Sequence, residues 1–471
     1  MDCARSLIQK ASLTSIATAS HYLKGYALVP ILAKSLTQGD YGLWVQIIAI
    51  VELLASVGSL SLGRSLIRFW PPSGQERAGA KQISTVLMAT AFSGALIGII
   101  VFIFSYHIAR TFLGQSENVH FVYLVILLVP ASIFSQIALV ALRAQGRLHS
   151  FSYLTIFDAA LTVLCATAMA LYDVSLTKFL ISLAVLRYCV FIIAYFISAK
   201  DVGFATPNLD ILRKFLRFSL PLLPTASLLW VINVSDRLFI SYFNSIEDVA
   251  AYSLQYSIGS LIGVVFSPIF LVLIPEMNRM WKNGEQERLS MIISLFREYG
   301  FLISLPLIVL SFAHTEEILA LISNAGYTAT PLIVGLVGCG ILIFSISCVY
   351  ENVACLTQDT SRITVAYSIA AASNAVLNVL FIPIMGMVGA AITTCISFVV
   401  MFFLTRRLAD ETLLKKMGWG ARVRIGLATV IMLSYTVLHE VALPWSIVNP
   451  LALYVLLHLL FFMSKKTYNQ K

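Results

Sequence analysis

Long apolar runs separated by short polar segments dominate the sequence. A helix needs about 20 consecutive apolar residues to cross the hydrocarbon core of a bilayer, and the chain carries about fourteen runs of that length. They lie near residues 14–36, 42–66, 82–109, 119–142, 151–172, 176–198, 218–243, 249–274, 291–313, 330–354, 363–383, 386–405, 423–440 and 444–463. The pattern predicts an all-α membrane protein with about fourteen transmembrane helices.

The composition agrees with a chain that is surrounded by lipid. Hydrophobic residues make up 59% of it and charged residues 12%, against about 25% charged residues in soluble domains. The net charge of +9 does not indicate nucleic acid, because the basic residues form short clusters between apolar runs, as in cytoplasmic loops. We therefore expect membrane lipids, and no nucleic acid, as partners.

The basic residues also predict an orientation. Alternate loops collect 26 of the 32 Lys and Arg residues, including the clusters at 64–81, 200–217 and 406–424, whereas the intervening loops carry acids such as Asp40 and Glu247. Translocation of short, positively charged loops is disfavoured. We expect a multi-pass protein of the inner (plasma) membrane with both termini in the cytoplasm.

A weak internal repeat suggests two halves. AKSLTQGDYGLW at 33–44 resembles ISYFNSIEDVAAY at 240–252, about 208 residues later. We expect an N-terminal bundle of helices 1–6 at residues 1–200, a C-terminal bundle of helices 7–12 at 201–410, and two additional helices at 411–471. Transporters built from such repeats place the substrate site between two bundles and alternate access to it.

Several strings resemble one known family when they are taken in order. They are TQGDYGLW, LGRSLIRFWPP at 62–72, ALRAQGRLHSFS at 141–152, FSLPLLPTASLLWVINVSDRLFI at 218–240 and TQDTSRITVAYSIAAASNAVLNVLFIPIMGMVGAA at 357–391. The chain resembles the polysaccharide transporters, the Wzx-type flippases of the MOP superfamily. The resemblance implies a two-bundle fold that flips a polyprenyl-phosphate- or pyrophosphate-linked oligosaccharide outward, as in O-antigen synthesis, without a cofactor.

Cations inside the predicted spans are the first candidates for a binding site, because charge in a membrane is expensive. Lys24, Arg187, Arg237 and Arg64 are candidates to hold the phosphate end of the cargo, since ammonium and guanidinium groups replace lost hydration. For Arg64, near the end of its span, snorkelling to the interface is the favoured alternative. The alternative for Lys24 and Arg187 is an ion pair with Glu52 or Asp158.

The carboxylates suggest the energy source. There is no GxxxxGK[ST] motif for ATP, so Glu52, Asp158 and Asp236 are candidates for exchange of H⁺ or Na⁺. Asp236 and Arg237 point about 100° apart on a helix, so they need not neutralise one another.

Neutral side chains complete the candidate site. His21 shares a helix face with Lys24. Asn374 and Asn378 lie four residues apart and can bind either sugar hydroxyls or a neighbouring helix. We expect no catalytic residue and no metal site.

Other functions remain open at this point. A MATE-like cation or drug antiporter would share the fold, and a peptidoglycan-precursor flippase would differ in its cargo. A membrane glycan polymerase or ligase is a different class, but its reactive residues usually lie in a sizeable outer loop. The longest predicted outer loop, near 314–329, offers only His314, Glu316 and Glu317, too few for a catalytic set. A passive scaffold leaves the charges inside the spans unexplained.

Overall fold

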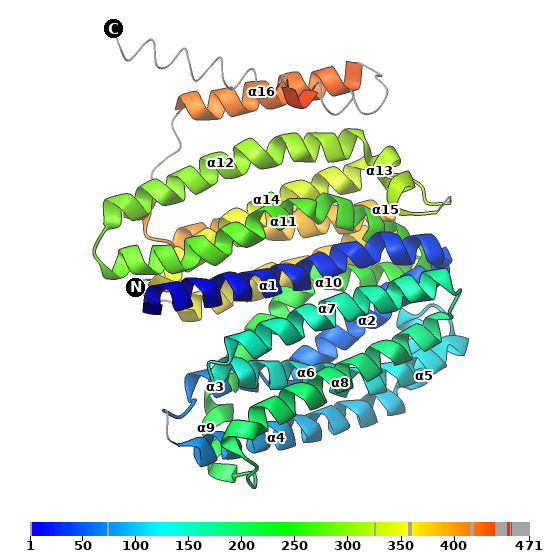
Figure 1. Cartoon of the computed structure of the whole chain (residues 1–471). Helices are drawn as coiled ribbons and strands as arrows, with labels where there is room; N and C mark the ends of the chain where they lie inside the picture. Colours follow the sequence, from blue (N-terminus) through cyan, green and yellow to red (C-terminus); the bar gives the residue numbers. More distant parts are fainter. Residues whose placement is uncertain are drawn as a thin grey trace. The chain divides into compact units, whose positions relative to one another are not determined.

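Helices make up every regular element of the described chain (Figure 1). The computed structural model describes residues 2–72, 75–324, 326–356, 360–414, 419–438, 450–452 and 454. Within these residues, ten helical stretches are long and apolar enough to cross a membrane. The all-α membrane fold is confirmed.

The chain groups into two compact units, Met1–Ser253 with Ile322–Tyr327 (unit 1) and Leu254–Leu321 with Thr328–Lys471 (unit 2). Unit 1 contains α1 (Asp2–Ser35), α2 (Gln38–Gly58), α3 (Leu62–Arg68), α4 (Glu76–Ile103), α5 (Ser105–Phe112), η1 (Ser116–Asn118), α6 (Val119–Ala144), α7 (Leu148–Leu171), α8 (Leu176–Val202), α9 (Leu209–Ser219), η2 (Leu220–Leu222), α10 (Leu223–Phe243) and the first turns of α11 (Ile246–Lys282). Unit 2 contains the rest of α11, α12 (Gln286–Ala313), most of α13 (Thr315–Ile322), α14 (Pro331–Leu356), α15 (Thr360–Leu408), η3 (Glu411–Leu413) and α16 (Trp419–Leu438). The division into bundles at 1–200, 201–410 and 411–471 stays a prediction.

The predicted span near 42–66 consists of two helices. Helix α2 ends at Gly58, and Leu60 and Ser61 adopt left-handed φ values of 50° and 52° before α3 begins at Leu62. Left-handed backbone interrupts a right-handed helix and costs about 1–2 kcal/mol per non-glycine residue. The prediction of a span near 42–66 did not include this break, because the apolar side chains continue through it.

Near the other end of the chain, the predicted spans at 363–383 and 386–405 correspond to the two segments of α15. Gly386 lies between them with φ 55° and ψ −135°, which is not helical. Glycine adopts such a backbone without steric cost. The span near 423–440 corresponds to α16, and the span near 444–463 lies mostly outside the described residues.

The two repeated loops share one capping geometry. The Thr37 hydroxyl accepts a hydrogen bond of 3.1 Å from the Asp40 amide at the start of α2. The Ser245 hydroxyl accepts a bond of 3.1 Å from the Asp248 amide at the start of α11. Thr37 and Asp40 precede Ser245 and Asp248 by the repeat distance. Both loops therefore start their helices in the same way, by N-capping.

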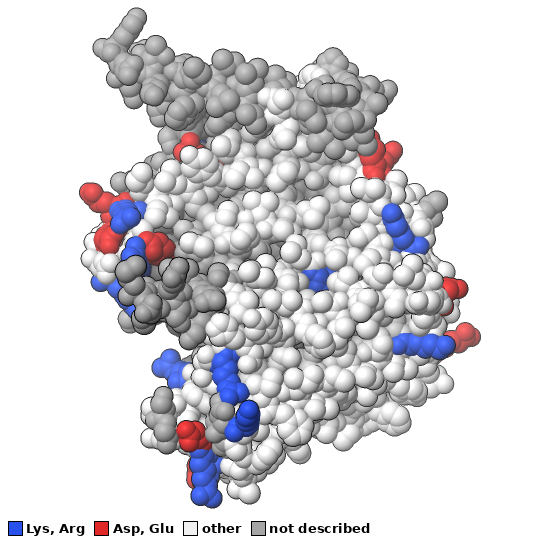
Figure 2. Space-filling view, in the orientation of Figure 1, with Lys and Arg blue, Asp and Glu red and all other residues white. Residues whose placement is uncertain are grey.

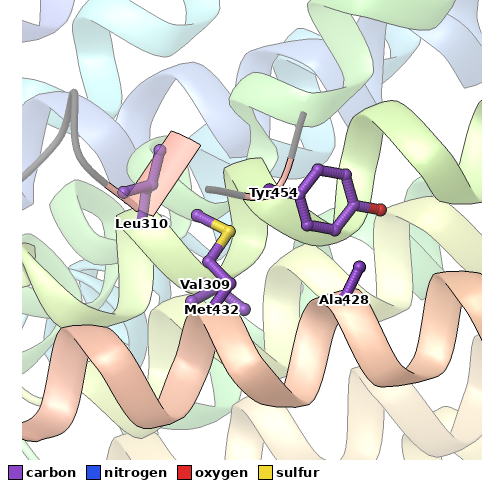
Figure 3. Close-up of a cluster of buried hydrophobic side chains, with 5 residues drawn as sticks. All are labelled: Val309, Leu310, Ala428, Met432 and Tyr454. Carbon is purple, nitrogen blue, oxygen red and sulfur yellow. The ribbon is translucent and has the colours of Figure 1, made fainter. Parts of the chain in front are cut away.

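Within unit 2, helix α16 packs against α12. Val309 and Leu310 of α12 form a buried cluster with Ala428 and Met432 of α16 and with Tyr454 (Figure 3). Such contacts bury apolar surface and give dispersion energy between helices.

Charged side chains gather at helix ends on the face shown in Figure 2, and the surface between them is almost free of charge. Exposed side chains on α4 and α8 include large apolar ones such as Phe92, Leu96 and Phe196. An apolar exposed surface of this kind is what lipid tails solvate.

Candidate functional site

Lys24 and Asp158 form a buried ion pair between α1 and α7. The Lys24 Nζ donates to Asp158 Oδ2 at 2.9 Å, and each side chain is 8% exposed. The pair brings together residues 134 positions apart. Lys24 therefore forms the ion pair with Asp158 that the sequence left open as an alternative to phosphate binding.

Arg187 of α8 approaches the same carboxylate. Its Nε lies 3.7 Å from Asp158 Oδ1, and its side chain is 27% exposed. Two cations thus share one carboxylate, and Arg187 is the more accessible of the two. The group formed by Lys24, Asp158 and Arg187, which we call the α1–α7–α8 triad, carries an excess positive charge.

Asp236 and Arg237 of α10 form the second ion pair. Arg237 Nη1 donates to Asp236 Oδ1 at 3.0 Å and to the Asn233 carbonyl at 3.0 Å. Tyr252 of α11 donates to Asp236 Oδ2 at 2.5 Å. The expectation that the adjacent charges need not neutralise one another was wrong, because the long arginine side chain bridges the angular separation between neighbouring helix positions.

Glu52 of α2 is a third carboxylate within electrostatic range of both ion pairs. Its side chain is exposed, and it interacts at longer range with Arg237, Arg187 and Lys24. Among the described residues it has neither a hydrogen bond nor an ion pair. Glu52 is thus the accessible carboxylate of the site.

The carboxylates and guanidinium groups of the two ion pairs differ in exposure. The Asp158 and Asp236 residues are 6% and 0% exposed, whereas the side chains of Arg187 and Arg237 are 27% and 12% exposed. Each buried carboxylate therefore has a more accessible guanidinium beside it. The two guanidinium groups are thus more accessible to an anion than the carboxylates that they pair with.

Arg64 does not join this group in the described structure. Arg64 lies exposed on α3 and has no carboxylate partner among the described residues. The side chain of His21 lies outside the described residues.

Asn374 and Asn378 are fully buried in unit 2. The Asn378 amide donates to Asn374 Oδ1 at 3.0 Å, and the Thr393 hydroxyl donates to Asn378 Oδ1. Because Thr393 lies beyond Gly386, these bonds join the two segments of α15. This is the interhelical alternative for the asparagine pair.

Two partners were missed from the sequence. Tyr252, which bonds Asp236, is the last residue of the repeated ISYFNSIEDVAAY string. Glu351 of α14 accepts a bond of 2.7 Å from the Tyr367 hydroxyl of α15, and its place inside the predicted span at 330–354 was the signal that could have identified it.

Sequence comparison supports one family. A family model described as "Polysaccharide biosynthesis protein" matches residues 7–281. An uncharacterized membrane protein of Methanocaldococcus jannaschii is 23% identical over 43% of this chain and 40% of its own length. The succinoglycan biosynthesis transport protein ExoT of Rhizobium meliloti is 22% identical over 57% of this chain and 53% of its own length. The chain thus spans about half or less of the curated relatives it matches.

Solved structures share the fold. The lipid II flippase MurJ in an inward closed conformation aligns with a TM-score of 0.73 and 16% identity over 97% of this chain and 99% of its own. An inward-facing multidrug resistance MATE family transporter of the MOP superfamily aligns with a TM-score of 0.60 and 14% identity over 88% and 95%. At these identities the likeness establishes the fold alone.

Proposed function

Because this chain belongs to the polysaccharide biosynthesis protein family, we propose that it flips a polyprenyl-phosphate- or pyrophosphate-linked oligosaccharide from the cytoplasmic to the outer leaflet of the plasma membrane. The family indicates a role in making polysaccharide, and the fold is one used by flippases and transporters. Transport proceeds by alternating access.

The α1–α7–α8 triad is the observation that carries this proposal. Lys24 and Arg187 share the single carboxylate of Asp158, and Arg187 is partly accessible within its span. When Glu52, the exposed carboxylate within range of these cations, takes up H⁺ or Na⁺, the positive charge of the triad has no second anion, and such a charge inside a membrane is expensive. The phosphate of a lipid-linked glycan is an anion that must cross the same hydrocarbon, so Arg187 is its first contact.

Arg237 is the second phosphate contact. Its guanidinium is oriented by Asp236 Oδ1 and by the Asn233 carbonyl, both at 3.0 Å. An oriented guanidinium offers two parallel N–H donors to a phosphate, which an ammonium group does not. Arg64, exposed on α3 beyond the span Gln38–Gly58, is a weaker candidate for phosphate contact.

Glu52 is the preferred coupling carboxylate. It is accessible, lacks a bonded partner among the described residues, and lies within electrostatic range of Lys24, Arg187 and Arg237. Binding of H⁺ or Na⁺ at Glu52 changes the charge that those cations experience. Asp158 and Asp236 are weaker candidates, because each is already held by a cation.

The proposed flipping can be tested by following the lipid-linked glycan in the membrane. Deletion of the gene should abolish surface display of one glycan and leave its lipid-linked repeat unit in the inner leaflet. In reconstituted vesicles, Arg187→Ala should slow flipping of that lipid, whereas Lys178→Ala, on the exposed first turn of the same helix, should not. Normal glycan display in the deletion strain would exclude the proposal.

A MATE-like cation or drug antiporter is the second candidate, and Glu52 favours it. An accessible carboxylate suits a cationic substrate, and the fold is shared with the MATE transporter. Altered drug sensitivity of the deletion strain, together with normal glycan display, would select this function.

A further inference from the structure

The two repeated loops meet at one end of unit 1, where they line a pocket of about 700 Å³. The loop charges predict that this end faces outward. The first loop contributes Asp40, and the second contributes Tyr242, Asn244 and Glu247. The end of α5 and the turn after it complete the wall with Arg110 and Gln115. We call this the outer-end pocket.

Hydrogen bonds and close packing fix the walls of this pocket. Ser241 donates to the Phe112 carbonyl at 2.9 Å, which joins α10 to α5. A Cβ on Gly42 would lie 2.1 Å from the Ile246 carbonyl oxygen, so the start of α2 touches the start of α11 as backbone. Walls joined in this way are preformed, which lowers the entropy lost when a ligand binds.

Unpaired polar groups remain inside this frame. Among the described residues, the exposed side chains of Arg110, Gln115, Asn244 and Glu247 have no hydrogen-bond partner within the protein and are open to solvent or to a ligand. Together they offer N–H donors, amide oxygens and a carboxylate. The pocket volume lies within the range of about 300–1,000 Å³ that is typical of small-molecule sites.

We propose that the outer-end pocket binds sugar residues of the cargo, an inference that rests on the proposed function. Sugar hydroxyls both donate and accept hydrogen bonds, which matches this mixture of groups. The exposed Tyr242 ring adds an apolar surface for the face of a sugar. Asp40 and Glu247 outnumber Arg110 in this pocket, so its net charge is negative and disfavours phosphate. The anionic end of the cargo therefore stays at Lys24, Arg187 and Arg237 while its sugars enter this pocket.

The probe is the phosphate-free oligosaccharide released by mild acid from the lipid-linked pool of the deletion strain. Saturation-transfer NMR with the purified full-length protein should show binding of this probe. The double variant Asn244→Ala/Glu247→Gln should weaken the affinity by roughly tenfold or more, because hydrogen bonds to a charged group are lost. Tyr242→Ala should also weaken it.

Matched controls lie at the same predicted membrane face. Tyr172→Ala and Lys178→Ala replace exposed residues outside the pocket and should leave probe affinity unchanged. Equal affinity of the wild type and the double variant would overturn the pocket assignment while the proposed function stands. A deletion strain that accumulates no lipid-linked glycan would instead overturn the proposed function, and the pocket assignment with it.

Discussion

The polar contacts inside the two units differ in kind. In unit 1, buried carboxylates hold lysine and arginine, as in the Lys24–Asp158 and Arg237–Asp236 pairs. In unit 2, buried contacts join amides and hydroxyls, as between Asn378 and Thr393, or a carboxylate to a hydroxyl, as between Glu351 and Tyr367. The ion pairs described there, Arg279–Glu276, Arg288–Glu285 and His314–Glu317, each have at least one exposed side chain. The weak sequence repeat therefore does not extend to the chemistry of the spans.

This difference separates binding from packing. Neutral hydrogen bonds between membrane helices contribute on average about 0.6 kcal/mol, and they attract no distant ion. Charged groups act over longer range in a medium of low dielectric. We therefore expect variants in unit 1 to alter transport and variants in unit 2 to alter stability alone.

The largest effect concerns which side of the membrane each loop occupies, because it is all or none. Reporters fused after Lys200 and after Lys471 should be cytoplasmic, and one at Ser245 should be outside. Alkaline phosphatase and fluorescent-protein fusions distinguish the two sides. An external Lys200 would reverse the ends of unit 1 and remove the outward assignment of its pocket.

Removing Lys24 should have the next largest effect. Lys24→Ala leaves Asp158 buried with only the more distant Arg187, and breaking a buried pair on one side costs about 3–5 kcal/mol. The variant should accumulate poorly in membranes, and its melting temperature in detergent should fall. The double variant Lys24→Met/Asp158→Leu should recover much of the stability but not the transport. Full stability of Lys24→Ala would contradict a structural role for the pair.

Arg237 variants should change transport more than stability. Arg237→Ala should slow flipping in vesicles by roughly tenfold or more, because a charge-assisted contact to phosphate is lost. Arg237→Lys should recover part of the rate, since it keeps the charge without the planar fork. Asp236→Asn should impair ion coupling more than substrate binding if that carboxylate titrates.

These rates are compared at matched membrane levels of protein. Normal flipping by Arg237→Ala would show that Arg237 is not needed for cargo. Failure of the variant to accumulate would assign its charge to structure, and the contrast between the units would then rest on Arg187.

The smallest effect is expected in unit 2. Asn378→Ala removes the bonds across the two segments of α15 and should lower stability by about 1–2 kcal/mol, with the flipping rate unchanged. Ser368→Ala, at an exposed position on the same helix, serves as the control. A tenfold loss of flipping by Asn378→Ala at normal stability would extend the binding site into unit 2.

Hydropathy predicted most of the helices, because the bilayer sets both their length and their composition. It missed the break at Leu60 and Ser61, where the backbone turns left-handed without any change in apolar character. The charged residues were identified for a similar reason, since any ionisable group inside an apolar run is conspicuous.

Their pairing was not predictable from the same pattern. Lys24 meets Asp158 only because α1 packs against α7, and spacing in the sequence carries no information about that contact. The Asp236–Arg237 contact was missed because helix angles describe Cβ directions and ignore the reach of arginine. The outer-end pocket depends on contact between the first turns of α2 and α11. The repeat showed that the two loops are similar in sequence, but it did not show that they touch.

The separation of Lys24 from Asp158 also has a consequence for biogenesis. Ribosomes add about 5–20 residues per second, and 134 positions separate the two residues, so Lys24 emerges on the order of 10 s before its carboxylate. An unpaired lysine at the centre of a helix adds about 2.5–3.5 kcal/mol to the free energy of insertion. This cost favours a position of the first helix beside the insertion machinery or at the lipid interface until α7 arrives and pairs with it.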